Sequence, residues 1–459
     1  MNSISNIDAI GSVPPSRIAA MFAQEQIAFA AAHPASRAAI DRGAGHFLNR
    51  VPLHWMSDWS MPFPMLVDKA WGARLMDIDG VKFDDFCLGD TGSMYGHSPK
   101  PVSKAIRKQA ASGLTYMLPT QDAMEVGRLL TERFGPFQWQ IATTATDANR
   151  FALRVARAVT GRKKILVFNA CYHGTVDETF VRLENGMAIH RPGLVGQAID
   201  LTQNTVVVEF NDIPALEKAL AAKDIACVIT EPVLTNSCMV LPAPGFHTAL
   251  RKRTREAGTL LLIDETHTIS TGLGGYTKTH GLEPDIFVLG KPVAGGVPAS
   301  VWGLSQETAG RFLETEKTRP AGHSGMGTTL SANPLQFAAM RACLSEVMTK
   351  GNYAHMEKLA DELEGALRKI IKKRKLPWHV ARVGARVEFI CAPGPLKNGT
   401  ESEAAHQPEL EKCIHLALLN RGSLIAPFHN MMLISPATKR KQVERLVKNF
   451  AEVTRLLTN

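Results

Sequence analysis

The chain has 459 residues, of which 45% are hydrophobic and 21% charged, which is ordinary for a globular protein and long enough for two domains. No apolar run reaches the roughly 18 residues that a transmembrane helix requires, so we expect no membrane partner. The formal charge of +9 would suit nucleic acid, but the basic runs lie in or beside helical patterns and no RNA-recognition signature accompanies them. We therefore expect no nucleic-acid partner.

The N-terminal segment begins without the basic start and apolar stretch of a secretion signal, so we expect a cytoplasmic protein. Residues 15–33 carry apolar side chains at helical spacing and predict a helix. Residues 72–88 predict a β-hairpin whose turn is Asp79-Gly80. The seven cysteines form no CxxC pair and no zinc-like cluster, so we expect reduced thiols and no metal site.

From about residue 115, short apolar strands alternate with helical segments, one of which ends at Gly258. The strands are predicted at 164–168, 226–230, 259–264, 285–290 and 300–305. Continuous apolar strands with helical crossovers predict an α/β fold, with a mostly parallel sheet covered by helices on both faces.

After about residue 345, a long helical pattern, short strands and a final helix predict a smaller α+β domain. We expect three parts: an N-terminal segment at 1–115 that contributes to the small domain, a large domain at 116–345, and the C-terminal small domain at 346–459.

Polar residues follow several predicted strands, at the sheet edge where ligands bind in open α/β sheets. They are Asp264, Lys291, Glu231, and the pair Tyr172 and His173, together with the run Thr143 to Thr146 before a predicted helix. Each of these alone has an ordinary structural interpretation, such as a helix cap for the threonines. Together and in this order they favour one chemistry.

That chemistry is the binding of pyridoxal 5'-phosphate. A lysine at a strand end can form an imine with the aldehyde cofactor, and a helix N-terminus with hydroxyl groups favours the phosphate. A buried carboxylate keeps the ring nitrogen protonated, which makes the ring an electron sink. Lys291, Thr144 to Thr146 and Asp264 would supply these features, and Tyr172 could stack on the ring.

The sequence resembles the class III aminotransferases, which are fold-type I pyridoxal-phosphate enzymes. It is most similar to the branch of glutamate-1-semialdehyde aminomutase and the β-amino-acid transaminases. The resemblance covers about residues 65 to 450 and is carried by "ACYHG" (170–174), "LLLIDETHT" (260–268), "LGKPVAGGVP" (289–298) and "GTTLSANP" (327–334).

The resemblance implies roles for individual residues. Lys291 would be the Schiff-base lysine that later moves the proton, Asp264 would pair with the ring nitrogen, and Tyr172 would cover the ring. Thr329 would reach the phosphate of the neighbouring subunit, which implies a homodimer with shared sites. The expected cofactor-binding residues are Thr144, Ala145, Thr146, Tyr172, His173, Asn211, Glu231, Asp264, Thr266, Lys291 and Thr329.

This sequence departs from the family on the substrate side. Thr266 stands where the family has valine, and His267 follows it. The arginine that β-amino-acid transaminases carry in the 54–64 region is absent, and Trp55 and Trp59 stand there instead. Arg386 is the nearby candidate for a substrate carboxylate, since arginine binds carboxylates bidentately, although a domain-packing ion pair explains it equally well.

We therefore expect an aminotransferase that takes a small-molecule amino donor and a carbonyl acceptor. An aminomutase acting within one molecule is the nearest alternative, and racemases and lyases use the same fold and residues. A nucleotide-binding protein would require a glycine-rich loop with phosphate-binding spacing, which the sequence lacks. A non-catalytic scaffold would leave Lys291 and Asp264 unexplained.

Overall fold

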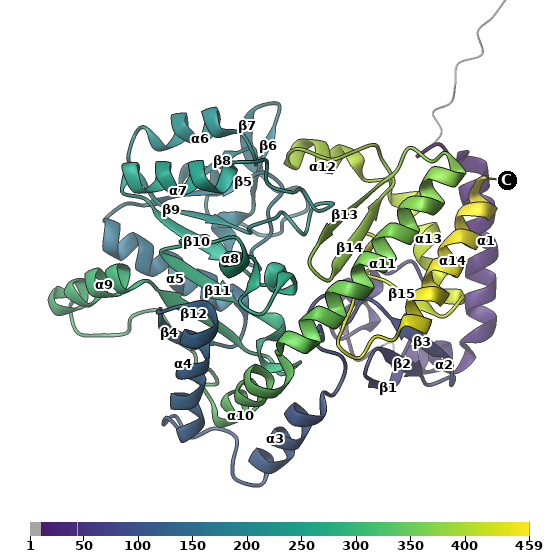
Figure 1. Cartoon of the computed structure of the whole chain (residues 1–459), viewed down its shortest axis with the longest axis horizontal. Coiled ribbons are helices and arrows are strands. Elements are labelled where there is room, and N and C mark those ends of the chain that lie inside the picture. Colours follow the sequence, from purple (N-terminus) through teal and green to yellow (C-terminus); the bar gives the residue numbers. More distant parts are fainter. Residues whose placement is uncertain (1–10, 44, 459) are drawn as a thin grey trace, which may run out of the picture.

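The computed structural model describes residues 11–43 and 45–458, and its centre is a seven-stranded sheet (Figure 1). In spatial order the strands are β4 (Gln138–Ala142), β12 (Ser300–Leu304), β11 (Ile286–Leu289), β10 (Leu260–Asp264), β9 (Ile225–Thr230), β5 (Lys164–Phe168) and β8 (Thr205–Val208). Only β12 runs antiparallel to its neighbours within this sheet. The predicted strands and the mostly parallel sheet are thus confirmed.

The strands of this sheet are buried on both faces because alternate side chains enter two different apolar clusters. Ile165 and Val167 of β5 face the cluster that includes α5 and α9, whereas Leu166 and Phe168 face the cluster of α6 and α7. The helices associated with this part are α3 (Lys100–Ala110), α4 (Gln121–Phe134), α5 (Ala145–Thr160), α6 (Ile213–Leu220), α7 (Phe246–Ala257), α8 (Gly275–Thr279), α9 (Gln306–Thr318) and α10 (Pro334–Ala342). A small hairpin, β6 (Val181–Glu184) and β7 (Met187–His190), lies beside β8.

The second part of the molecule combines the two ends of the chain (Figure 1). One sheet contains β1 (Val67–Trp71), β2 (Arg74–Asp77), β3 (Lys82–Asp85) and β15 (Ser423–Leu424), and β15 pairs in parallel with β3. A three-stranded sheet contains β13 (His379–Val383), β14 (Arg386–Ile390) and β16 (Met431–Leu433). The proposed domain boundaries at 115 and 345 stay predictions, but the N-terminal strands do share a sheet with a C-terminal one.

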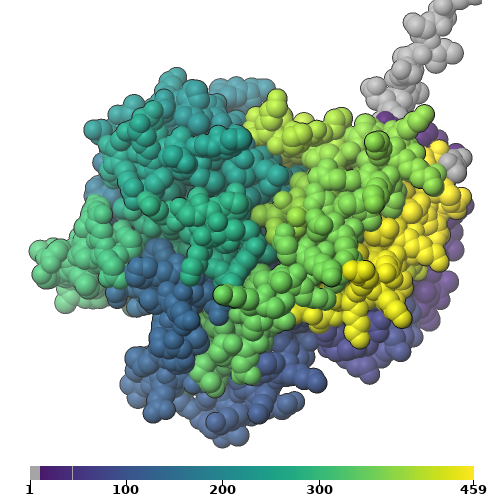
Figure 2. Space-filling view, viewed as in Figure 1, coloured from purple at the N-terminus to yellow at the C-terminus, as the bar shows by residue number. Residues whose placement is uncertain are grey.

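Helices cover these two smaller sheets. They are α1 (Pro15–Ala32), α2 (Pro34–Gly43), α11 (Lys350–Arg374), α12 (Gly399–Ala405), α13 (Pro408–Asn420) and α14 (Arg440–Thr458). Helix α1 packs against α13, so the early and late parts of the chain lie side by side on the surface (Figure 2). Among residues 11–43 and 45–458, no helix is long and apolar enough to cross a membrane. The first ten residues, where a targeting signal would begin, lie outside the described part.

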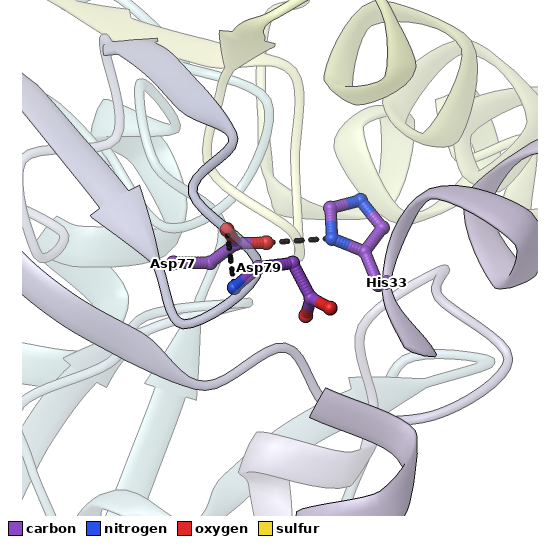
Figure 3. Close-up of side chains that lie close together, drawn as sticks. All are labelled: His33, Asp77 and Asp79. Carbon is purple, nitrogen blue, oxygen red and sulfur yellow. Dashed lines mark hydrogen bonds and ion pairs between the residues drawn. The ribbon is translucent and has the colours of Figure 1, made fainter. Parts of the chain in front are cut away.

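The predicted hairpin at 72–88 is confirmed, and its turn fixes the start of α2 (Figure 3). The carboxylate of Asp79 accepts hydrogen bonds from the backbone N–H groups of Ala35 (2.6 Å) and Ser36 (2.9 Å), in the first turn of α2. Asp77 bonds to Nδ1 of His33 at 2.6 Å and accepts from the N–H of Asp79. This close group of His33 and two aspartates is therefore accounted for as a structural junction between hairpin and helix.

Candidate active site

The adjacent strands β10 and β11 bring Asp264 and Lys291 to one edge of the central sheet. The two strands are parallel, and Asp264, the last residue of β10, pairs with Val288 of β11. Lys291 comes three residues later, beyond the end of β11, and its φ is +44°. A left-handed backbone costs a residue other than glycine about 1 kcal/mol, and such strain is concentrated at functional sites.

The amine of Lys291 lies between two side chains from distant parts of the chain. Its Nζ is 2.7 Å from Oδ2 of Asp90, which belongs to the turn segment after β3, and 2.9 Å from Nε2 of His267, which follows β10. Burial opposes ionisation of Asp90, but the charges of Lys291 and its neighbours outweigh this and hold the pKa of Asp90 well below its usual range. Lys291 is therefore a half-buried amine beside an ionised carboxylate.

Asp264 is buried and fully engaged with the chain. Its carboxylate accepts hydrogen bonds from Nδ2 of Asn149 (2.9 Å), Oγ1 of Thr266 (2.7 Å) and Nδ1 of His173 (3.1 Å). Burial alone would raise the pKa of Asp264, but the hydrogen bonds and the charge of His173 lower it. In return, Asp264 and Cys171 raise the pKa of His173 to about 10 in spite of its burial. The pair is an ionised carboxylate with a protonated imidazole.

The predicted run Thr144 to Thr146 lies at the N-terminus of α5. Thr144 is the N-cap and accepts the backbone N–H of Asp147 at 3.2 Å. The first N–H groups of a helix have no acceptor within it, so this end can receive an anion. Oγ1 of Thr146 accepts the N–H of Thr175 at 3.0 Å, which ties the turn to the loop after β5.

Two glycines let this turn approach its neighbours. A Cβ added at Gly174 would lie 2.1 Å from Oγ1 of Thr146, and one added at Gly290 would lie 2.7 Å from Cβ of Ala145. Gly290 directly precedes Lys291, so the helix turn, the loop after β5 and the lysine segment converge on one place. Only glycine permits both approaches.

Tyr172 and Glu231 lie in the loops that follow β5 and β9. The Tyr172 ring is 37% exposed, and the guanidinium of Arg191 lies 5.9 Å from its centre. Glu231 is buried and accepts hydrogen bonds from Thr235 and Asn236, and burial raises its pKa to about 7 despite the nearby charge of His173. Tyr172 is therefore accessible to a ligand, whereas Glu231 is buried.

Two predicted residues make no hydrogen bond to Lys291 or Asp264 in the described part of the chain. The Asn211 amide donates to the carbonyls of Leu241 (3.0 Å) and Lys397 (2.8 Å) and accepts the N–H of Ala243 (2.7 Å). Its hydrogen bonds thus join loops rather than reach Lys291 or Asp264, and its assignment to the cofactor stays a prediction. Thr329 is exposed in a loop next to Leu330, and Oγ of Ser331 in the same loop lies 3.1 Å from Oγ1 of Thr143, so the role of Thr329 towards a neighbouring subunit stays a prediction.

The residues predicted for the substrate side differ in their burial and contacts. Trp59 packs against the main apolar cluster, whereas Trp55 is 39% exposed and meets Phe428 edge-on. Arg386, on β14, is fully buried, and its guanidinium contacts the side chains of Thr91 and His267 and the carbonyl of Thr235. The role of Arg386 as a partner for a substrate carboxylate stays a prediction, since the contacts the structure gives it are with the chain itself.

A family model described as Aminotransferase class-III matches residues 55–453. The chain belongs to the class-III aminotransferase family. Its fold is that of the fold-type I enzymes, and pyridoxal 5'-phosphate is its cofactor.

Solved structures and curated relatives agree with this family. Crystal structures of a glutamate-1-semialdehyde-aminomutase from Pseudomonas aeruginosa PAO1, one of them a lysine variant in complex with PMP, are 47% and 46% identical, with TM-scores of 0.95. Each covers 97% of this chain and 99% of its own. A glutamate-1-semialdehyde 2,1-aminomutase from Syntrophus aciditrophicus is 34% identical over 86% of this chain and 91% of its own length. An omega-transaminase from Sphaerobacter thermophilus is 25% identical, with a TM-score of 0.85, over 93% of this chain and 98% of that one.

The residues observed in this class-III enzyme fit the cofactor. The α5 N-terminus with its two glycine approaches suits a phosphate, and the ionised Asp264 suits a protonated ring nitrogen. Four residues of the site were not singled out from the sequence: Asp90, Thr91, Asn149 and Gly174. Gly174 falls in the segment at 170–174 that carries the family resemblance, which was the available signal. Asn149 could be assigned only from the packing of α5 against β10.

Proposed function

We propose that this class-III enzyme is an aminotransferase that moves an amino group from a small-molecule donor to a carbonyl acceptor. The observation that carries the proposal is the convergence of Lys291, Asp264 and the N-terminus of α5 at one sheet edge. Bound pyridoxal phosphate supplies an electron sink for the substrate carbon. The chain supplies the lysine that holds the cofactor and then moves the proton.

The roles of the individual residues follow from their surroundings. The amine of Lys291 takes the proton from the substrate carbon and gives it up again, since it is the half-buried base of the site. The carboxylate of Asp264, held ionised by His173, keeps the ring nitrogen protonated. The first turn of α5 holds the phosphate, and Tyr172 covers the ring. The buried Glu231 supports the surroundings of the cofactor ring.

The aminomutase reaction is the second candidate, and the relatives favour it. Both the 47%-identical crystal structure and the 34%-identical curated relative are proteins named for glutamate-1-semialdehyde aminomutase activity. A mutase would use the same residues but return the amino group to the substrate that supplied it. The two reactions therefore differ in their need for a separate acceptor.

An acceptor-dependence experiment tests the proposal. Purified holoenzyme is incubated with a panel of amino donors, with and without a keto acid or aldehyde, and with glutamate 1-semialdehyde alone. A transaminase consumes donor only when the acceptor is present, whereas conversion of the semialdehyde without any acceptor would establish the mutase. The Lys291→Ala variant is the matched control, because it removes the amine and should be inactive in every arm.

The substrate pocket remains a prediction built on the tryptophans. Trp55 and Trp59 replace the arginine-bearing segment of β-amino-acid transaminases, and Arg386 is engaged with the chain. Since Trp55 is the exposed member of the pair, we propose that it favours bulky apolar donors. Equal rates for small and bulky donors, or an unchanged preference in Trp55→Ala, would exclude this role.

We also propose that the enzyme is a homodimer. Exposed large apolar side chains concentrate in two segments, at 47–56 and 114–118, and monomers rarely expose so many together. Thr329 and Leu330 are exposed on a loop that could reach a second copy. Light scattering should give twice the monomer mass of 50.0 kDa, and a monomeric mass at micromolar concentration would refute the proposal.

A cytoplasmic location is proposed on the state of the thiols. All seven cysteines are buried and unpaired, which suits a reducing compartment. Cell fractionation checks it, and recovery of the protein outside the cytoplasmic fraction would contradict it.

A further inference from the structure

The contacts of His267 determine which of its ring nitrogens carries the proton. Nδ1 lies 3.0 Å from a guanidinium nitrogen of Arg386 and 2.8 Å from the hydroxyl of Thr91. A hydroxyl can donate or accept, but a guanidinium can only donate. Nδ1 must therefore accept from Arg386, which excludes both the doubly protonated ring and the Nδ1–H form. The single ring proton is on Nε2.

This tautomer has a consequence for Lys291. Nε2 of His267 is 2.9 Å from Nζ of Lys291, and with its proton in place it is a donor. An ammonium group has no lone pair and cannot accept a hydrogen bond. The contact is satisfied only when Lys291 is the neutral amine, which accepts from His267 and donates to Oδ2 of Asp90 at 2.7 Å.

We propose that His267 is a positioning residue, locked by Arg386 as the Nε2–H tautomer, which opposes protonation of Lys291 while Asp90 favours it. The two neighbours act on the same amine in opposite directions. Asp90 stabilises the ammonium by its charge, and the N–H of His267 together with the cation of Arg386 destabilises it. This proposal deepens the proposed function, because a group that must gain and release a proton in each turnover works best when neither form is strongly favoured.

The surroundings of the cluster agree with a neutral His267. Burial is the main cause that holds the pKa of His267 well below its usual range; Lys291, when protonated, and Arg386 act in the same direction, and Asp90 opposes them. Asp90 after β3 and His267 after β10 contact the amine, and the other charged and titratable groups near these two residues are Tyr172 after β5, Arg386 on β14 and His429 before β16. His429 is in turn 3.3 Å from Glu388 of β14.

The arrangement explains why a fully buried arginine lies so close to the lysine. Arg386 is 0% exposed, and its nearest carboxylate contact is Oδ1 of Asp90 at 3.9 Å, longer than a hydrogen bond. Its direct bonds go to neutral groups: Thr91, the carbonyl of Thr235 and the ring of His267. Arg386 therefore makes no hydrogen bond to Asp90, whose carboxylate bonds to Lys291 instead, and one of its N–H groups fixes the imidazole of His267.

Competitive labelling of Lys291 tests the proposal without turnover. Full-length protein freed of cofactor is treated with acetic anhydride across a pH series, and acetylation of the Lys291 peptide is followed by mass spectrometry. We expect His267→Met to move the labelling midpoint to higher pH by about one pH unit, which is a tenfold change in the neutral fraction. Asp90→Asn should move it to lower pH, since the stabilising charge is gone.

Two further variants sharpen the test. Arg386→Met should move the midpoint in the same direction as His267→Met, because the ring can then turn its acceptor towards Lys291. Thr91→Val is the matched control and should leave the curve unchanged, since its hydroxyl does not fix the tautomer. Should His267→Met fail to fold, His267→Gln serves instead, with a smaller move to higher pH because an amide can accept as well as donate.

A His267→Met curve that coincides with the parent curve, or moves to lower pH, would overturn the proposal. So would a shift of the same sign in the His267 and Asp90 variants. Because the labelling needs neither cofactor nor substrate, either result would leave the proposed aminotransferase activity standing. Conversely, an enzyme without transaminase activity could still show the opposite shifts.

Discussion

The carboxylate of Asp264 is satisfied by Asn149, His173 and Thr266, whereas the carboxylate of Asp90 leaves its Oδ1 without a hydrogen bond in the described structure. The two sides of the active site thus differ in how firmly their charges are held. Around Asp264, each donor stabilises one ionised state, which suits a charge that does not change during the reaction. Around Lys291, the contacts compete, which suits a group whose protonation changes.

The largest expected effect on turnover comes from removing Lys291, the group whose protonation changes. Lys291→Ala should lower turnover by at least about 10³-fold, because both the attachment point and the proton-moving base are lost. Steady-state donor consumption measures the loss. Borohydride reduction of the parent should leave a cofactor adduct on Lys291, and the variant should have none at this position. Retained turnover in the variant would remove the basis of the proposed mechanism.

The next largest effect is expected from removing the charge of Asp264, which does not change during the reaction. Asp264→Asn should reduce turnover by roughly 10²-fold, since the ring nitrogen loses its anionic partner, and by analogy with broken buried pairs it should cost about 3 kcal/mol of stability. Unfolding in urea and initial rates provide the two measurements. An Asn variant with the parent's rate would show that the charge of Asp264 is not used.

The same variant has a distinctive pH signature. Because the folded-state pKa of His173 is raised to about 10, its contribution to stability is complete below the unfolded value near 6.5 and is lost as the pH rises through about 10. Melting temperatures of the parent should therefore fall across this range. Asp264→Asn should flatten that part of the curve, and parallel curves for the two proteins would contradict the assignment of the pair.

A smaller effect is expected where the phosphate turn is packed. Gly174→Ala should weaken cofactor retention by about tenfold, because its φ is +78° and the new Cβ would lie 2.1 Å from Oγ1 of Thr146. Gly186→Ala is the matched control, with a φ of +76° and nothing within 4 Å. Equilibrium dialysis compares the two variants. If both variants retain cofactor equally, the contact between residue 174 and Thr146 does not affect cofactor binding.

The smallest effect is expected at Thr266, which connects Asp264 to the segment of Lys291. Oγ1 of Thr266 donates to Asp264 and accepts the N–H of Gly290 at 3.1 Å, so one hydroxyl connects the fixed carboxylate to the lysine segment. Thr266→Val, which introduces the residue typical of the family, should cost about 1–2 kcal/mol of stability and change turnover only a few-fold. Denaturant unfolding is the measurement. A loss as large as that in Asp264→Asn would show that the two sides are more strongly coupled than their contacts indicate.

The sequence was sufficient for the parts of the site that lie at strand ends. Asp264 and Lys291 follow apolar strands, and Thr144 precedes an amphipathic helix, so local pattern located all three. Asp90 and Arg386 could not be assigned in this way, because they reach the site through the packing of the small domain against the sheet. Arg386 lies 119 positions from His267 and 295 from Thr91, and no periodicity reports contacts at such separations.

Asn211 and Trp59 stay predictions for a different reason. Asn211 has a left-handed φ of +71° and three backbone partners at a loop junction, and no sequence pattern shows whether such a residue also supports a cofactor. Trp59 packs against the main apolar cluster, and a large aromatic residue has the same sequence appearance in a pocket and in a core.

The parallel pairing of β3 with β15 also sets an order of events during synthesis. The first 85 residues leave the ribosome with an open strand edge whose partner is encoded more than 300 residues later. The central sheet can fold in that interval, since its strands all lie between residues 138 and 304. Asp90 and Arg386 can meet only after the segment containing Arg386 has emerged, so the contact that fixes His267 beside Lys291 forms late. Until β15 has emerged, the unpaired edge of β3 is the part of the nascent chain most exposed to mispairing. We expect a chaperone to protect this edge.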